Sequence, residues 1–308
     1  MMNYEKKVCC ICGPGSSKTA GVNAALPAEG LGFAELQDQW NGFFKDTDKE
    51  RSFFSYVRCV VCGLLYCPQY FYAEQLANLY QNMPDNTADV DLSSLRKTQY
   101  GYFQTLLPYL DNLHGDYFEM GPDIGLFTEH VLKTNQFEKI WLAEPNRAVW
   151  LHLQQLLKTQ PSQLFSDMVQ EDPIPNAVLG AAVMIHVLDH VLDPVDVLQH
   201  LHAKMRDGGI LAIVTHDESS LLANLLKKRW PAYCLQHPQL YRPKSIKHLL
   251  EKAGFKVLEV QKTYNHFPFG YLLNHLVWAL GFKKKIFPDW KKLQLPLKLG
   301  NIITIATK

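Results

Sequence analysis

The sequence predicts an α/β protein in which a doubly wound, mainly parallel sheet of seven strands follows a small cysteine-rich module. Three observations support this fold class. The segment 117–128, YFEMGPDIGLFT, reads as a buried strand, a glycine turn and the start of a helix. Apolar strands and amphipathic helices then alternate as far as residue 260. Six of the seven cysteines lie before residue 70, which favours metal binding over disulfides.

Each predicted element has a local reason. Strands are predicted at 117–120, 140–143, 163–166, 178–185, 210–215, 255–260 and 302–306. Helices are predicted after Ser93 and Ser94, after the glycine turn, and at 147–158, 194–205 and 244–253. Asp193 followed by Pro194 is a typical helix start, and glycines 208 and 209 end that helix.

Composition bounds the class of protein. A chain of 308 residues with 47% hydrophobic residues is long enough for two domains. The net charge of +1 gives no general attraction to nucleic acid, so no nucleic-acid partner is expected. Neither a signal peptide nor an apolar run long enough to span a bilayer is evident. We therefore expect a cytoplasmic protein.

Two Cys-x-x-Cys-Gly elements predict a metal site. They contain Cys9 and Cys12 in the first element and Cys59 and Cys62 in the second. The spacing lets both thiolates of an element face one tetrahedral ion, and the glycine permits the tight turn. Four soft ligands are what a structural Zn²⁺ ion needs, so 1–75 is predicted to be a zinc-binding module. Buried free thiols with chance spacing are the alternative.

Together these segments resemble the class I S-adenosylmethionine-dependent methyltransferases. FEMGPDIGLF resembles their first motif, which is usually an acid followed by G-x-G-x-G. AEP at 143–145 resembles the acid that ends the second strand. The runs at 187–215 and 237–257 are similar to later segments of the family. The resemblance covers about 95–261 and the C-terminal strand, and it implies a Rossmann-like domain over 76–308 whose last strand is antiparallel.

The resemblance implies S-adenosyl-L-methionine as a cofactor. The residues that would bind it are Glu119, Gly121, Asp123, Gly125, Glu144, Asp167, Met168 and His186. Glu144 is placed to accept hydrogen bonds from the ribose diol, as acids do in dinucleotide folds. Asp167 would bind the adenine amino group, with Met168 covering the ring, although a turn after a strand often carries Asp. Glu119 would reach the methionine ammonium through water or help to shape the turn, or it is purely structural. His186 would contact the cofactor through its backbone.

Asp123 departs from the family pattern because it stands at the middle glycine of the first motif. Asp tolerates a left-handed backbone better than most residues, but it places a side chain where the ligand approaches closely. Two outcomes stay open. The carboxylate either points away from the cofactor or toward its cationic end, or it narrows the pocket and weakens binding. We favour intact binding because the other motifs are present.

Two histidines are candidate general bases. Methyl transfer from a sulfonium is an in-line displacement, so a base is needed only where the acceptor must lose a proton. His190 matches the His of the family's Glu-His pair, and Asp189 stands in place of that Glu. A histidine suits this task at neutral pH. His237, in a loop expected to cross the pocket, is the second candidate. The alternative for His190 is a histidine that packs and hydrogen-bonds below the ligand, and the alternative for His237 is a lid residue.

The acceptor class rests on the second cysteine element. Arg58-Cys59-x-x-Cys62-Gly63-Leu64 resembles the zinc module fused to some bacterial sugar and small-molecule methyltransferases. The expected activity is therefore methyl transfer (EC 2.1.1.-) to a sugar, nucleotide-sugar or related small molecule. A catalytically inactive zinc protein that acts as a binding scaffold is one alternative. An RNA or protein methyltransferase that uses the zinc module to hold its macromolecule is another, and the basic cluster 227–230 is its only local hint.

The segment 262–299 is predicted as an insert between the last two strands. It contains an apolar helix from 271 to 280, followed by three lysines at 283–285. Such a helix can rest on an anionic membrane surface through 271–285. The favoured alternative is a helix that covers the acceptor pocket or forms a dimer contact. The sequence does not determine the oligomeric state.

Overall fold

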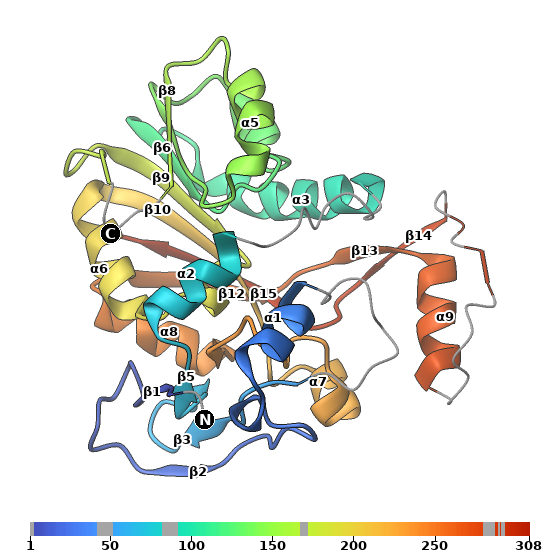
Figure 1. Cartoon of the computed structure of the whole chain (residues 1–308). Helices are drawn as coiled ribbons and strands as arrows, with labels where there is room; N and C mark the ends of the chain where they lie inside the picture. The colour runs from blue at the N-terminus through green and yellow to red at the C-terminus, as the bar shows by residue number, and fades with distance from the viewer. Residues whose placement is uncertain are drawn as a thin grey trace.

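The computed structural model describes residues 3–41, 52–81, 92–166, 172–279, 287–288, 290 and 293–308. Its centre is a seven-stranded sheet with the strand order β12-β15-β10-β9-β6-β7-β8 (Figure 1). The strands are β6 (Asp116–Met120), β7 (Ile140–Ala143), β8 (Ser162–Phe165), β9 (Leu179–Ile185), β10 (Met205–His216), β12 (Lys256–Lys262) and β15 (Asn301–Thr307). Strand β15 runs antiparallel to β10 and β12, whereas β6 to β10 pair in parallel. The predicted fold class is confirmed.

The strand order reverses between β6 and β9. From β6 the chain moves outward through β7 and β8, and it then returns to β9 on the other side of β6. Met120 at the end of β6 pairs with Ala143 of β7 and Met184 of β9, so these strands end at one edge. Ligands of doubly wound sheets bind at such a reversal, outside the carboxyl ends of the strands.

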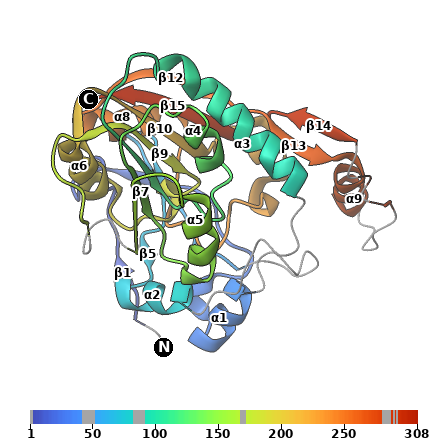
Figure 2. The same ribbon diagram turned by 90° about the horizontal axis from the view of Figure 1, so that it is seen from above.

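Helices cover both faces of this sheet (Figure 2). Helices α3 (Leu92–Leu106), α4 (Thr128–Leu132) and α5 (Trp150–Leu156) pack on one face, and α6 (Pro194–Lys204) and α8 (Pro243–Lys252) pack on the other. Alternation along β6 explains this, because Tyr117 belongs to one core and Phe118 to the opposite one. The side chain of Asp193 caps α6 by accepting a hydrogen bond from the backbone N–H of Asp196.

The N-terminal part is built of short elements. These are β1 (Glu5–Lys6), β2 (Lys18–Ala20), α1 (Phe33–Asn41), β3 (Val57–Cys59), β4 (Leu65–Tyr66), β5 (Gln69–Tyr70) and α2 (Ala73–Gln81). Strands β2, β3 and β4 form a sheet whose fourth strand, β11 (Gln239–Leu240), comes from the loop before α8. The two parts of the chain therefore share a sheet, and the division at residue 75 stays a prediction.

Short helices complete the connections. They are η1 (Ala28–Gly30), η2 (Leu107–Tyr109), η3 (Arg147–Val149), η4 (Leu188–His190), α7 (Leu221–Leu226) and η5 (Lys227–Arg229). One boundary differs from the prediction. Strand β10 begins at Met205 rather than 210, and its register against β9 shifts between Met205 and Ile210. The predicted glycine turn is therefore an irregularity inside the strand, where Gly208 has a φ of +78°.

The insert forms an arm. Strands β13 (Asn265–Pro268) and β14 (Gln294–Leu297) pair antiparallel, and α9 (Phe269–Ala279) lies at their far end, apart from the seven-stranded sheet in both views (Figures 1 and 2). The three lysines at 283–285 lie outside the described residues. Among the helices that are described, none combines the length and apolarity needed to cross a bilayer.

Candidate active site and cysteine cluster

The turn after β6 depends on two glycines. Gly121 and Gly125 have φ values of +69° and +75°, a region that side chains rarely adopt. A Cβ atom on Gly121 would lie 2.5 Å from a methyl group of Val187, and one on Gly125 would lie 2.6 Å from a methyl group of Leu156. The positive φ therefore favours glycine at both positions, and the neighbouring methyl groups would have to shift to admit a Cβ atom.

Asp123 adopts the left-handed backbone of this turn, with a φ of +52°. Its side chain is exposed. Its backbone N–H donates to Oε2 of Glu144 at 3.0 Å, so the turn is tied to the end of β7. The expectation that the Asp123 carboxylate leaves cofactor binding intact stays a prediction.

Glu144 follows β7 and is only 5% exposed. Its other oxygen, Oε1, accepts from the backbone N–H of Asn146 at 2.8 Å. Burial raises the pKa of Glu144 to about 7. A carboxylate has about four lone-pair sites, so the two backbone contacts leave capacity for a diol.

Glu119 lies on the face of β6 that packs against α4. Its Oε2 accepts hydrogen bonds from the hydroxyls of Tyr117 at 2.8 Å and Thr128 at 2.7 Å. Burial raises the pKa of Glu119 to about 7. These contacts join the strand to the first residue of α4.

Four histidines and one aspartate converge where β9 and β10 end. His186 follows β9, Asp189 and His190 lie in η4, His216 ends β10, and His237 precedes β11. The ring centres of His186 and His216 are 4.7 Å apart, those of His216 and His237 are 5.0 Å apart, and those of His190 and His237 are 4.6 Å apart. We call these five residues the histidine cluster.

Burial keeps the imidazoles of the histidine cluster neutral. It lowers the pKa of His186 to about 3 and the pKa values of His216 and His237 to about 4, and it holds that of His190 well below its usual range. Burial also raises the pKa of Asp189 to about 6. At neutral pH the cluster therefore holds four neutral imidazoles and one largely ionised carboxylate.

Hydrogen bonds orient the rings of this cluster. Oδ2 of Asp189 accepts from the backbone N–H of His216 at 3.1 Å and lies 2.8 Å from its Nδ1. Nδ1 of His237 lies 2.8 Å from the carbonyl oxygen of Ala232. Because a carbonyl only accepts, Nδ1 of neutral His237 carries the proton and Nε2 carries the lone pair.

Sequence reasoning missed two members of this region. His216 was not predicted, although it directly follows the predicted fifth strand and therefore lies at the same edge as His186. Tyr80 of α2 was also missed, and its hydroxyl lies 3.0 Å from Nδ1 of His190. The backbone N–H of His186 donates to the carbonyl of Val214, so the predicted backbone contact with the cofactor would fall to the His186 carbonyl. The predicted site residues 167 and 168 lie outside the described residues.

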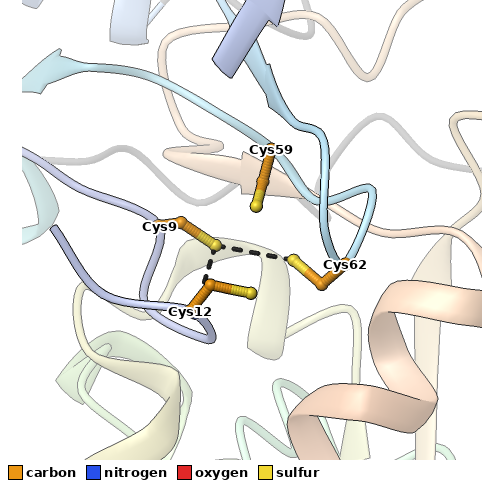
Figure 3. A group of neighbouring side chains, drawn as sticks. All are labelled: Cys9, Cys12, Cys59 and Cys62. Carbon is orange, nitrogen blue, oxygen red and sulfur yellow. Dashed lines mark hydrogen bonds between the residues drawn. The ribbon is translucent and has the colours of Figure 1, made fainter. Parts of the chain in front are cut away.

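The four predicted cysteine ligands lie together. Figure 3 shows the sulfur atoms of Cys9, Cys12, Cys59 and Cys62 turned toward one another. All four sulfurs lie within 4.8 Å of one another, and those of Cys9 and Cys62 are 3.5 Å apart. A zinc–sulfur bond of about 2.3 Å requires tetrahedral sulfur separations of about 3.8 Å. The donor set and its spacing therefore fit a structural zinc ion.

The backbone of each cysteine element supports this arrangement. The glycines that follow Cys12 and Cys62 have φ values of +80° and +79°. Their N–H groups donate to the carbonyls of Cys9 and Cys59 at 2.8 and 3.0 Å. This is the role that the sequence predicted for them.

The N-terminal part holds the loop that carries His237. The hydroxyl of Tyr56 donates to the carbonyl oxygen of His237 at 2.7 Å, and the N–H of Cys67 donates to that of Pro238 at 2.8 Å. An ion pair also joins the N-terminal part to the segment after β10. Arg58 pairs with both carboxylate oxygens of buried Glu218, at 2.6 and 2.9 Å.

Comparison with known proteins defines the class. A family model described as a methyltransferase domain matches residues 95–260, which is more than half of the chain. The chain belongs to this methyltransferase-domain family. A search of curated proteins finds no match.

Solved structures show the same fold. A Bacillus halodurans protein assigned as a methyltransferase is 13% identical, with a TM-score of 0.50 over 68% of this chain and 99% of its own. A chain in the complex between the Trm112 methyltransferase activator and a methyltransferase of Haloferax volcanii is 12% identical, with a TM-score of 0.50 over 73% and 99%. An S-adenosylmethionine-dependent methyltransferase from Archaeoglobus fulgidus is 16% identical, with a TM-score of 0.47 over 69% and 94%. The strand order of the sheet, the family model and the two structures with a TM-score of 0.50 together define a Rossmann-like methyltransferase fold.

Proposed function

We propose that this protein uses S-adenosyl-L-methionine to methylate an oxygen or carbon atom of a sugar, a nucleotide-sugar or a related small molecule. The observation that carries the proposal is the convergence at one sheet edge. The glycine turn after β6 and Glu144 after β7 lie beside the histidine cluster after β9 and β10. This arrangement supports the proposal, because a nucleotide-like cofactor held at this edge would lie next to a proton acceptor.

The residues of the chain have separable roles in this proposal. The backbone of the turn at 121–125 and the carboxylate of Glu144 hold the cofactor, which supplies an electrophilic methyl group when it is bound. Nε2 of His237 receives the proton that the acceptor loses, because its Nδ1 already donates to Ala232. Its pKa of about 4 makes it a weaker base than the ordinary histidine expected from the sequence, so its role depends on its position beside the acceptor. His190, oriented by Tyr80, is the second candidate for this role.

The polar groups near the cluster support a hydroxyl-rich acceptor. The amide of Asn301 lies 3.2 Å from Nε2 of His186 and 3.3 Å from the hydroxyl of Tyr102. Neutral imidazole, amide and phenol groups both donate and accept hydrogen bonds, as recognition of sugar hydroxyls requires. The resemblance of the cysteine module to that of bacterial sugar methyltransferases supports the same acceptor class.

The first test is calorimetric titration of the full chain with S-adenosyl-L-methionine. We expect binding by the unmodified protein, and at least tenfold weaker binding by Glu144→Gln. Glu138→Gln is the matched control, because Glu138 is exposed and lies just before the same strand that Glu144 follows. Absence of binding at millimolar cofactor would remove the enzyme proposal and favour a scaffold protein.

The second test identifies the acceptor class. Nucleotide-sugars are incubated with the protein and methyl-labelled cofactor, and products are detected by mass spectrometry. His237→Asn is expected to lower kcat at least tenfold while cofactor affinity stays unchanged. Label recovered in RNA or protein, and not in nucleotide-sugars, would contradict the proposed acceptor.

A further inference from the structure

The histidine cluster contains two buried polar atoms that have no hydrogen-bond partner among the described residues. They are Oδ1 of Asp189 and Nδ1 of His186. The side chain of Asp189 is completely buried. Leaving a buried polar atom unpaired costs about 1–3 kcal/mol, so native structures rarely keep one without a partner such as water or an ion.

We propose that His186, Asp189 and His216 bind a divalent transition-metal ion. One donor atom from each residue lies within 4.8 Å of a donor atom from each of the others. Metal–ligand bonds of about 2.1 Å require donor separations of about 3–4 Å, so a closure of about 1 Å completes the site. This ion is distinct from the zinc ion that the four cysteines fit, and its site lies at the edge of the seven-stranded sheet.

The charge of Asp189 favours a cation at this place. Among the described residues, no lysine or arginine forms an ion pair with its buried carboxylate, whose one recorded ionic partner is His216. The pair of His200 and Asp172 provides a contrast, because there Lys204 contacts the same carboxylate oxygen at 2.7 Å. A buried carboxylate without a cation carries a large desolvation cost, which a bound metal ion offsets.

Neighbouring groups can orient the two imidazoles as metal ligands. Nδ1 of His216 lies 2.8 Å from Oδ2 of Asp189, so an ion bound by both atoms would take the place of the proton between them. The amide nitrogen of Asn301 lies near three acceptors, on His186, Tyr102 and Asn265, but carries only two hydrogens. A half-turn of this amide, together with a half-turn of the Asn265 amide that then donates to it, places the Asn301 oxygen against Nε2 of His186. Nε2 then donates, and the lone pair of Nδ1 is left for the metal.

The donor set indicates the class of metal. Two imidazole nitrogens and one carboxylate oxygen suit Zn²⁺, Co²⁺, Fe²⁺ or Mn²⁺, whereas Mg²⁺ and Ca²⁺ prefer sites made only of oxygen. Three protein ligands also leave coordination positions open to an oxygen atom of solvent or substrate. The site is therefore of the open kind, unlike the closed four-cysteine cluster.

Cobalt loading of the metal-free full chain tests the proposal. Co²⁺ bound to thiolates gives a sulfur charge-transfer band, and Co²⁺ bound to imidazole and carboxylate does not, so the two sites are read separately. We expect two Co²⁺ ions per chain in the unmodified protein. His186→Ala and His216→Ala should each lose the ion without the charge-transfer band, and Cys59→Ser should lose the ion with it.

The controls separate a lost site from a lost fold. His200→Ala removes a partly exposed histidine of another Asp–His pair and should retain both ions. The retained charge-transfer band in the histidine variants reports that the chain is still folded. The proposal would be overturned if the unmodified protein bound Co²⁺ at the thiolates alone. It would also be overturned if both histidine variants kept the second ion. No cofactor is present in this measurement, so its result is independent of the proposed methyl transfer.

Discussion

At the scale of single residues, burial of Glu119 beside the glycine turn makes ionisation of its carboxyl group unfavourable. Glu119 is buried and accepts hydrogen bonds from two hydroxyls, yet its pKa is raised to about 7 from an ordinary value of 4.5. The hydrogen bonds favour the ionised form, and burial outweighs them. The folded state therefore binds a proton that the unfolded chain has released between these two pH values.

This difference predicts how Glu119 affects stability as the pH changes. Stability contributed by the protonated group is fully present below pH 4.5 and is lost as the pH rises through 7. Glu119→Gln removes the ionisation. We expect its free energy of unfolding, relative to that of the unmodified protein, to rise by roughly 2 kcal/mol from pH 5 to pH 7.5.

Urea unfolding at the two pH values measures the difference. The comparison between variants is needed because the buried histidines act in the opposite direction. Their lowered pKa values mean that stability is lost as the pH falls from 6.5 toward 4. Equal differences between the two proteins at pH 5 and pH 7.5 would show that the pKa of Glu119 is not raised.

At the scale of elements, the second cysteine segment and the loop before β11 behave as one unit. Strand β4 pairs with β11, Leu65 facing Leu240, only a few residues after His237. The hydroxyl of Tyr56, just before β3, donates to the carbonyl oxygen of His237. The position of a candidate base is thereby set by residues that lie about 180 positions away in the sequence.

Removal of the Tyr56 hydroxyl tests this coupling. Tyr56→Phe removes the hydroxyl that donates to the buried carbonyl oxygen of His237. We therefore expect the free energy of unfolding to fall by about 1–2 kcal/mol. Under the proposed function, kcat should fall while the dissociation constant for the cofactor stays unchanged. Tyr109→Phe is the control, since it removes a tyrosine hydroxyl that binds Glu259 away from the histidine cluster. An equal loss of kcat in both variants would contradict the positioning role.

At the scale of the whole molecule, the cysteine module and the methyltransferase domain share a core. Cys59, Cys62 and Leu64 pack in the same apolar cluster as Ile246 and Leu250 of α8. The side chain of Lys252, at the end of α8, donates to the carbonyl of Ile11 at 2.6 Å. Loss of the module's structure would therefore expose part of the domain's core.

We predict that zinc removal destabilises the entire chain. Cys59→Ser should abolish stoichiometric zinc and lower the melting temperature of a single cooperative transition, because metal binding energy is folding energy for such sites. Elemental analysis of freshly purified protein and differential scanning calorimetry measure both effects. Cys234→Ser, at a cysteine outside the four-cysteine cluster, should keep the zinc. Two separate transitions, with only the weaker one affected, would contradict this coupling.

Much of the fold and part of the site follow from local patterns. The strand before Gly121, the capped helix at Asp193 and the two cysteine elements were all predictable, because each depends on residues that are neighbours in the sequence. Strand boundaries were predictable to within a few residues except in β10. Residues 205–209 of β10 precede the predicted start of the strand and pair with β9 in an irregular register. Such pairing depends on a second strand, so the local sequence does not show it.

The sequence by itself determined the α/β class and the four cysteines, because periodicity and spacing encode them locally. It also carried the motifs by which the chain resembles the methyltransferase family. Tertiary structure alone decided that His216 joins His186 and Asp189, that Tyr80 meets His190, and that β11 completes the sheet of the cysteine module. These contacts join segments that lie far apart along the chain. Packing of the whole chain brings them together, and no local pattern records which distant residues will meet.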